Sequence, residues 1–96
     1  MKVRITAPAE ADLEEIGDRI ALDSPAAAER FVGELREAAS ALAAHPKRFP
    51  SVRSIFGVRK KVYRRYLIFF RIEAGEVQVL RIVHGSRDWA ALVRAI

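Results

Sequence analysis

The chain contains no cysteine, so disulfide scaffolds and thiolate metal sites are excluded. No stretch approaches the ~20 consecutive apolar residues that a membrane-spanning helix needs. The residues before Glu10 contain no apolar segment of the length found in secretory signals. The only two histidines, His45 and His84, lie far apart in the sequence, so we predict no metal site and no cofactor. We therefore expect a cytoplasmic protein without a membrane partner.

What the chain does contain is typical of a folded domain. It has 96 residues, of which 51% are hydrophobic and 30% are charged. This composition excludes a disordered or low-complexity chain, and the length is sufficient for one domain only. We predict a single domain over residues 1–96.

The charged residues are unevenly distributed along the chain. Residues 1–50 carry seven Lys/Arg and nine Asp/Glu, whereas residues 51–96 carry ten Lys/Arg and three Asp/Glu. Between Lys47 and Arg71 there are nine basic residues and no acidic one. Such asymmetry indicates either a polyanionic or acidic partner or a solvated basic face.

The N-terminal half predicts a strand followed by two helices. Residues 2–6 alternate in polarity like a short strand, and Thr6 then stands where a helix N-cap is expected. Apolar residues recur at helical spacing to about Leu22. Ser24 and the proline after it predict the start of a second helix, which Pro46 ends. Because the turn between the helices is short, we expect an antiparallel hairpin.

The C-terminal half predicts three strands, because its polarity alternates with a period of two. Arg64-Arg65 and the region around Gly75 supply the turns, and residues 88–96 form a short helix or a tail. The predicted class is α+β with the order β-α-α-β-β-β, a helix hairpin on one face of a mostly antiparallel sheet. The strand segments, rich in β-branched and aromatic residues, are 58–63, 66–72 and 77–83.

The predicted strands are apolar on both faces of the sheet. In segment 66–72, Ile68 and Phe70 alternate with Leu67 and Phe69. A helix hairpin covers only one face of a sheet. The other face must be covered by the C-terminal segment, by a second copy of the chain or by a partner.

Five segments spread over the whole chain carry, in their order and spacing, a resemblance to a known protein family. They are Ala11-Asp12-Leu13-Glu14-Glu15-Ile16, Ala28-x-Arg30-Phe31, Gly57-Val58-Arg59, Tyr66-x-Ile68-x-Phe70-Arg71 and Leu80-Arg81-Ile82-Val83-His84-Gly85-Ser86-Arg87-Asp88. The ordered set resembles the RelE/ParE superfamily of bacterial toxins. It is most similar to the ParE branch, whose members are often named plasmid stabilisation proteins.

The resemblance implies the toxin of a type II toxin–antitoxin system. Members of the ParE branch are described as inhibitors of DNA gyrase, without established catalytic residues. Their usual partner is a ParD-like antitoxin, a ribbon-helix-helix DNA-binding dimer with a C-terminal segment that wraps the toxin. The resemblance thus implies a hetero-oligomer with this antitoxin, DNA gyrase as the target, and no sequence-specific DNA binding by the chain itself.

An enzymatic alternative comes from the RelE branch, whose members cleave mRNA in the ribosome. Such cleavage needs a base, an acid and cations around the phosphate, and Arg59, Arg81, His84 and Arg87 would have to supply them. The ribonuclease pattern has an arginine where this chain has Leu67, and a tyrosine after the last strand, where this chain has none. These departures favour the gyrase inhibitor. A third alternative is a non-toxic family member that only binds its antitoxin.

The residues predicted to bind antitoxin or target also have structural alternatives. The basic second strand could be a charged edge that blocks aggregation. Arg81, which strict alternation places in phase with Val79 and Val83, could pair with a helix carboxylate such as Glu15. Trp89 could anchor the C-terminal segment, and His84 could be a hydrogen-bonded structural residue. The predicted binding set is Arg59, Lys61, Tyr63, Arg71, Arg81, Arg87 and Trp89.

Overall fold

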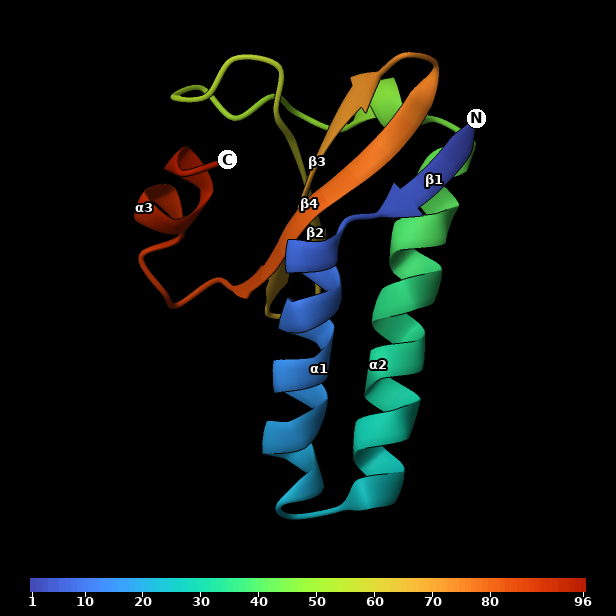
Figure 1. The fold of residues 1–96 in the computed structure, drawn as a ribbon, viewed down its shortest axis with the longest axis vertical. Helices are drawn as coiled ribbons and strands as arrows, with labels where there is room; N and C mark the ends of the chain where they lie inside the picture. The colour runs from blue at the N-terminus through green and yellow to red at the C-terminus, as the bar shows by residue number, and fades with distance from the viewer.

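Two long helices form a hairpin that lies against one face of a four-stranded sheet (Figure 1). The structure is a computed structural model that describes residues 1–96. None of its helices has the length and hydropathy that crossing a bilayer requires. The elements in chain order are β1 (Lys2–Ile5), α1 (Ala7–Ala21), α2 (Pro25–Ser40), the 3-10 turns η1 (Ala41–Ala43) and η2 (Pro46–Arg48), β2 (Arg59–Tyr63), β3 (Tyr66–Glu73), β4 (Glu76–His84) and α3 (Trp89–Arg94).

The two long helices start where the sequence predicts, but only one of the two predicted caps is formed. The Ser24 hydroxyl accepts a hydrogen bond from the Ala27 amide at 3.1 Å and so caps α2. Thr6 occupies the N-cap position of α1, yet its side chain makes no capping bond. Its hydroxyl instead donates to the carbonyl of Val79 in β4 at 2.7 Å. Thr6 is therefore the N-cap residue that the sequence predicts, but its hydroxyl is directed to β4 and makes no capping bond.

The second helix is shorter than the sequence suggests. It ends at Ser40 and not at Pro46, and the chain continues through the tighter turns η1 and η2. In η1 the Ala44 amide donates to the carbonyl of Ala41, the three-residue spacing of a 3-10 helix. Leu42, within this turn, is fully buried in the core beneath the hairpin.

The sheet has the order β1-β4-β3-β2 and is mostly antiparallel. The pairs β2–β3 and β3–β4 are antiparallel hairpins, whereas β1 runs parallel to β4. The predicted α+β class and element order are confirmed, including the short helix at the C-terminal end. The β3–β4 turn carries Ala74 and Gly75 with φ of 52° and 76°, so both residues are in the left-handed region of a tight hairpin turn.

A β-bulge interrupts the pairing of the two central strands. Phe69 lies opposite Arg81, but the next residue, Phe70, lies opposite Val79. Leu80 is therefore an extra residue in β4, and the side chains that follow it are shifted by one position.

The bulge overturns the strict alternation predicted for this strand. Val83 faces the second core together with Leu80, whereas Ile82 faces the first core with Val79. Arg81, opposite Phe69, is therefore out of phase with Val79 and lies on the same side of the sheet as Val83. Its guanidinium reaches the N-terminal half of α1.

Each face of the sheet has its own apolar core. The core beneath the hairpin includes Ile68 and Phe70, and the opposite core includes Leu67 and Phe69, as their alternation predicts. The opposite core is closed by Val93 of α3 and by residues of the segment 51–58. The sequence allowed the C-terminal segment, a second copy or a partner to cover this face. In the structure the chain covers it with its own C-terminal helix and the segment 51–58.

Candidate functional site

Half of strand β4 has no strand beside it on one edge. The pairing with β1 ends at Ile5 and Val79, so Leu80–His84 extends beyond it. At this point α1 begins and its first turns run along the open edge (Figure 1). The first turns of α1 therefore cover the part of the β4 edge that β1 leaves unpaired.

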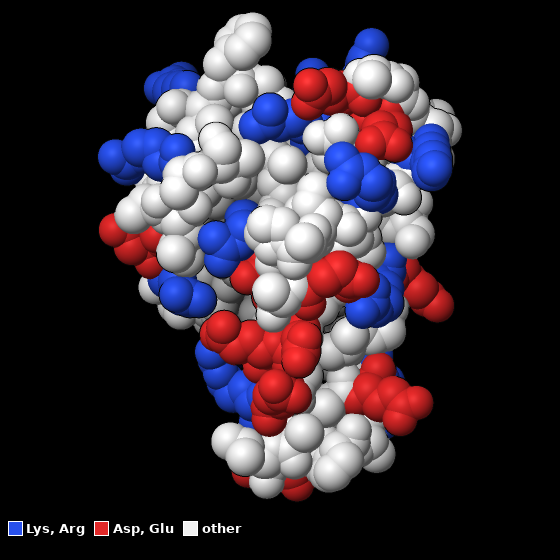
Figure 2. Space-filling model, viewed as in Figure 1, with Lys and Arg blue, Asp and Glu red and all other residues white.

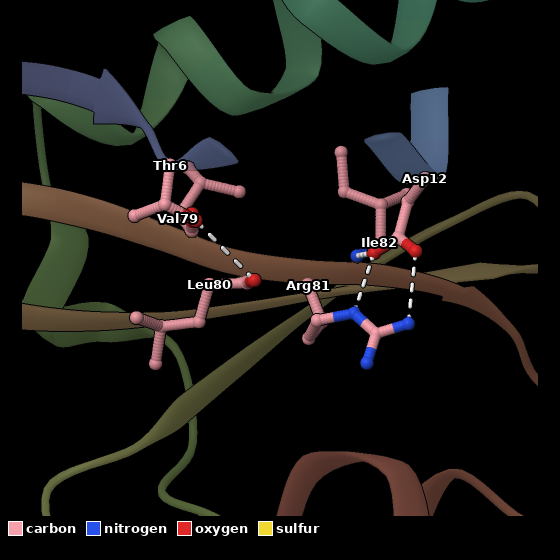
Figure 3. A network of polar contacts seen from close by, with 6 residues as sticks. All are labelled: Thr6, Asp12, Val79, Leu80, Arg81 and Ile82. Atoms are coloured by element: carbon pink, nitrogen blue, oxygen red, sulfur yellow. Dashed lines mark hydrogen bonds and ion pairs between the residues drawn. The ribbon is translucent and has the colours of Figure 1, made fainter. Parts of the chain in front are cut away.

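An aspartate of α1 occupies this edge and binds both backbone and side chain of β4 (Figure 3). The Arg81 guanidinium donates to Asp12 through Nε at 2.8 Å and Nη2 at 2.9 Å. The amide of Ile82 donates to the same carboxylate at 2.8 Å. The hydrogen bonds that Arg81 donates to Asp12 raise the pKa of Arg81, against the opposing effect of burial. Asp12, and not Glu15, is thus the helix carboxylate that pairs with Arg81.

The end of β4 brings His84 and Arg87 near the same carboxylate. The His84 ring packs edge-on against Tyr66, with centroids 5.1 Å apart. The Ser86 hydroxyl lies 2.7 Å from Nδ1 of His84, and the Ser86 amide also donates to that atom. Arg87, His84 and Asp12 line one small hollow, in which Arg87 is exposed. Three of the four residues of the ribonuclease alternative therefore gather at one end of the sheet.

Arg59 is not part of that group, because it lies on β2 at the opposite edge of the sheet. Its guanidinium donates to the carbonyls of Lys47 and Phe49 at 3.1 and 2.6 Å. Lys61 donates to the carbonyl of Ala38, near the end of α2, at 2.7 Å. Arg59 thus ties the segment after α2 to the sheet, and Lys61 ties the last turn of α2 to it.

The pKa of two groups on this side is shifted. Burial, with a smaller contribution from the charge of Arg48, lowers the pKa of Lys61. The Tyr63 hydroxyl donates to Glu34 of α2 at 2.6 Å, and this hydrogen bond lowers the pKa of Glu34. The basic side of β2 is therefore tied to the helix hairpin.

The other two members of the predicted set lie on the α3 side of the sheet. The Trp89 ring packs on Phe69 with centroids 5.4 Å apart, and the Lys60 ammonium lies 5.1 Å from the centre of the indole. Trp89 thus anchors the C-terminal helix. Arg71 is half-buried; its Nη1 lies 3.9 Å from Glu73, and its buried Nε has no hydrogen-bond partner.

A groove of about 250 Å³ runs between the start of α1, the open part of β4 and α3. Its walls are mainly apolar, and Arg81 is its one charged lining residue. Such an apolar groove is suited to an extended or helical peptide segment. The groove is lined by Thr6, Pro8, Leu80, Arg81, Leu92, Ala95 and Ile96.

Asp12 is the residue of this site that sequence reasoning missed. A signal was present: Asp12 lies three residues after Ala9 and four before Ile16, within the apolar stripe of α1. A carboxylate in a buried stripe needs a partner. The partner itself, 69 residues away along the chain, could not be identified from spacing.

Comparison with known proteins gives one family and several related structures. Residues 3–89 match the family described as the ParE toxin of the type II toxin–antitoxin system parDE. The chain is similar to a chain of the chromosomal ParDE toxin–antitoxin system from P. aeruginosa. The TM-score is 0.78 and the identity 27%, over 88% of this chain and 95% of that one. It is also similar to a chain of the RelBE2 toxin–antitoxin complex from Mycobacterium tuberculosis. There the TM-score is 0.64 and the identity 26%, over 86% and 95% of the two chains. No curated protein sequence matches significantly.

Proposed function

The chain belongs to the ParE toxin family of type II toxin–antitoxin systems, and from this membership we propose that it inhibits DNA gyrase in the cytoplasm. Inhibition is by binding, without catalysis by the chain. Its antitoxin is ParD-like, with a ribbon-helix-helix domain that binds DNA. The similarity to a chain of the ParDE system of P. aeruginosa supports this type of partner.

The observation that carries the proposal is the use of Arg81 in an internal ion pair. A ribonuclease needs its cations free to meet a phosphate whose charge grows in the transition state. Arg81 donates two hydrogen bonds to Asp12 within the chain, and Nδ1 of His84 is engaged by Ser86. Leu67, at the position of the arginine of the ribonuclease pattern, is buried in the second core. These features favour a binding toxin over a nuclease.

The antitoxin is proposed to bind along the groove beside β4, next to Arg81 and Arg87. The apolar walls of this groove supply the burial, and Arg81 is the charged residue of its lining. Arg59, Lys61 and Tyr63 hold the fold together through internal hydrogen bonds. A binding role for these three, and for Arg71 and Trp89, stays a prediction.

Incubation of the purified toxin with DNA gyrase and supercoiled plasmid tests the proposal. We expect cleaved plasmid to accumulate as toxin is added, and the purified antitoxin to prevent this. In parallel, the toxin is incubated with ribosomes programmed with mRNA, where we expect no cleavage. Cut mRNA together with intact plasmid would replace the gyrase proposal by the ribonuclease alternative. Unrestricted growth of cells that express soluble toxin alone would indicate a non-toxic member.

A further inference from the structure

Phe56 is the most exposed large apolar residue of the chain. Its relative exposure is 103%, so it makes almost no contact with the rest of the molecule. The next, Leu22, is 86% exposed and lies in the turn between α1 and α2. In Figure 1 the turn between α1 and α2 and the yellow-green segment before β2 lie toward opposite ends of the long axis. Phe56 therefore contributes little to the stability of the fold, and a binding role would account for an aromatic residue at this position.

The turn that presents Phe56 is held in a fixed shape. The Val52 amide donates to the carbonyl of Val58 at 2.7 Å, which closes the turn at its base. The Ile55 amide donates back to Val52, and the Val58 amide donates to Ile55. Val52 and Val58 are buried in the second core, and Ile55 packs against it. The aromatic ring is therefore held on a closed turn, and little conformational entropy is lost when it binds.

Gly57 allows this geometry. Its φ of 80° lies in the left-handed region, where a residue with a Cβ is strained. The glycine lets the chain reverse directly after Phe56 and return to Val58. The side chain of Phe56 consequently stands at the tip of the turn.

The electrostatic surroundings indicate the chemistry of the partner. The segment from Lys47 to Arg71 contains nine cations and no anion. The cations of β2 that follow the turn are engaged: Arg59 with backbone carbonyls and Lys60 with the Trp89 ring. Arg53 is the cation within the turn itself, and it is exposed. An apolar ring beside one free cation fits an apolar pocket with an acidic rim on a protein.

Nucleic acid is a poorer fit to this turn. A side chain that wedges between bases needs several cations on the flanking phosphates. Within the turn, Ser54, Ile55 and Gly57 carry no charge, which leaves Arg53 alone for that task.

We propose that Phe56 is the anchor through which the toxin engages its target protein. This inference rests on the proposed function, because the target used to test it is DNA gyrase. No residue of the turn lines the groove beside β4, where the antitoxin is proposed to bind, so we place the target contact on a separate surface. Aromatic anchors in a desolvated pocket commonly carry a large share of the binding energy of an interface.

Substitution of Phe56 with alanine tests the anchor, and Leu22→Ala is the matched control at the second most exposed large apolar residue. We measure the toxin concentration that gives half-maximal plasmid cleavage by gyrase. It should rise roughly tenfold or more for Phe56→Ala. Phe56→Trp should return this concentration most of the way to the wild-type value. Leu22→Ala should leave it at the wild-type value. The affinity of all variants for the antitoxin should stay within about twofold of the wild-type value, as expected for contacts outside that interface.

Three results would overturn the proposal. One is wild-type potency of Phe56→Ala on gyrase. The second is an equal loss of antitoxin affinity, which would make the turn part of the antitoxin surface. The third is a matching loss of affinity for a naked DNA fragment, which would make the ring a nucleic-acid contact. If wild-type toxin leaves gyrase unaffected, the proposed function fails separately. Growth arrest by soluble wild-type toxin but not by Phe56→Ala would then support the anchor, and equal arrest would reject it.

Discussion

The Asp12 carboxylate accepts three hydrogen bonds, and all three donors belong to two adjacent residues of β4. Two come from the Arg81 guanidinium and one from the Ile82 amide. The side chains of Arg81 and Asp12 are 22% and 12% exposed, so water can replace these bonds only in part. Removal of the acceptor would leave a charge and an amide poorly solvated, which costs more than the intact bonds contribute.

We predict that Asp12→Ala lowers the free energy of unfolding by about 2 to 3 kcal/mol. Asp12→Asn should lower it less, because an amide oxygen still accepts one hydrogen bond. The control is Glu15→Ala, which removes an exposed pair with Arg19 and should cost below ~0.5 kcal/mol. Urea denaturation, followed by the fluorescence of the single tryptophan, measures all three. Equal stability of Asp12→Ala and Glu15→Ala would mean that the edge of β4 is solvated without penalty.

Among the elements, the β3–β4 hairpin has a strained backbone at Ala74, a position where another residue type would fit better. Ala74 has a φ of 52°, in the left-handed region where the Cβ of alanine is unfavourable. The next residue, Gly75, adopts a similar conformation without cost. The hairpin with the most extensive pairing in the sheet therefore closes on a suboptimal turn.

We predict that Ala74→Asn stabilises the protein by about 0.5 to 1 kcal/mol, because asparagine tolerates this conformation and Asn-Gly is the preferred two-residue turn. Both residues of the turn are exposed, so the substitution changes no core contact. The matching change Gly75→Ala should destabilise by a similar amount, since it adds a second strained residue. Thermal unfolding of the two variants checks both signs. A decrease for Ala74→Asn would show that the turn is not the site of the strain.

At the scale of the whole molecule, charge is separated between the hairpin and the sheet. In the face drawn in Figure 2, acidic side chains gather over the helix hairpin in the lower half of the view. Most of the basic residues of the second half of the chain lie on and around the strands. Such separation orients an approaching charged partner before contact, and it acts on the association rate more than on affinity.

We predict that salt slows binding to the antitoxin without speeding its release. Between ~0.1 and ~1 M salt the screening length falls from ~10 to ~3 Å, which removes long-range attraction but leaves close apolar contacts. The double variant Arg65→Glu and Arg87→Glu, at one end of the sheet, should associate more slowly and lose part of the salt dependence. Glu29→Gln on α2 should behave like the wild type. Stopped-flow association and dissociation rates measure this. If salt changed mainly the dissociation rate, the charges would lie inside the interface.

The sequence by itself determined the element order, the fold class and the family. Helical spacing, the Ser24 cap and the period-two segments are local signals, and local signals survive in any tertiary context that buries the same faces. The apolar character of both faces of β3 likewise required a second cover. Leu67, where the ribonuclease pattern has an arginine, and the absence of a tyrosine after the last strand favoured the ParE branch from the sequence alone.

Only the tertiary structure decided which charged residues are available for binding. The bulge at Leu80 takes Arg81 out of phase with Val79, and its guanidinium meets Asp12 at the edge of β4. Arg59 and Lys61 are engaged by carbonyls of segments distant in the chain. Register shifts and hydrogen bonds between distant segments depend on how whole elements pack. A one-residue change of phase leaves no trace in the local pattern, yet it reverses the face of every side chain that follows.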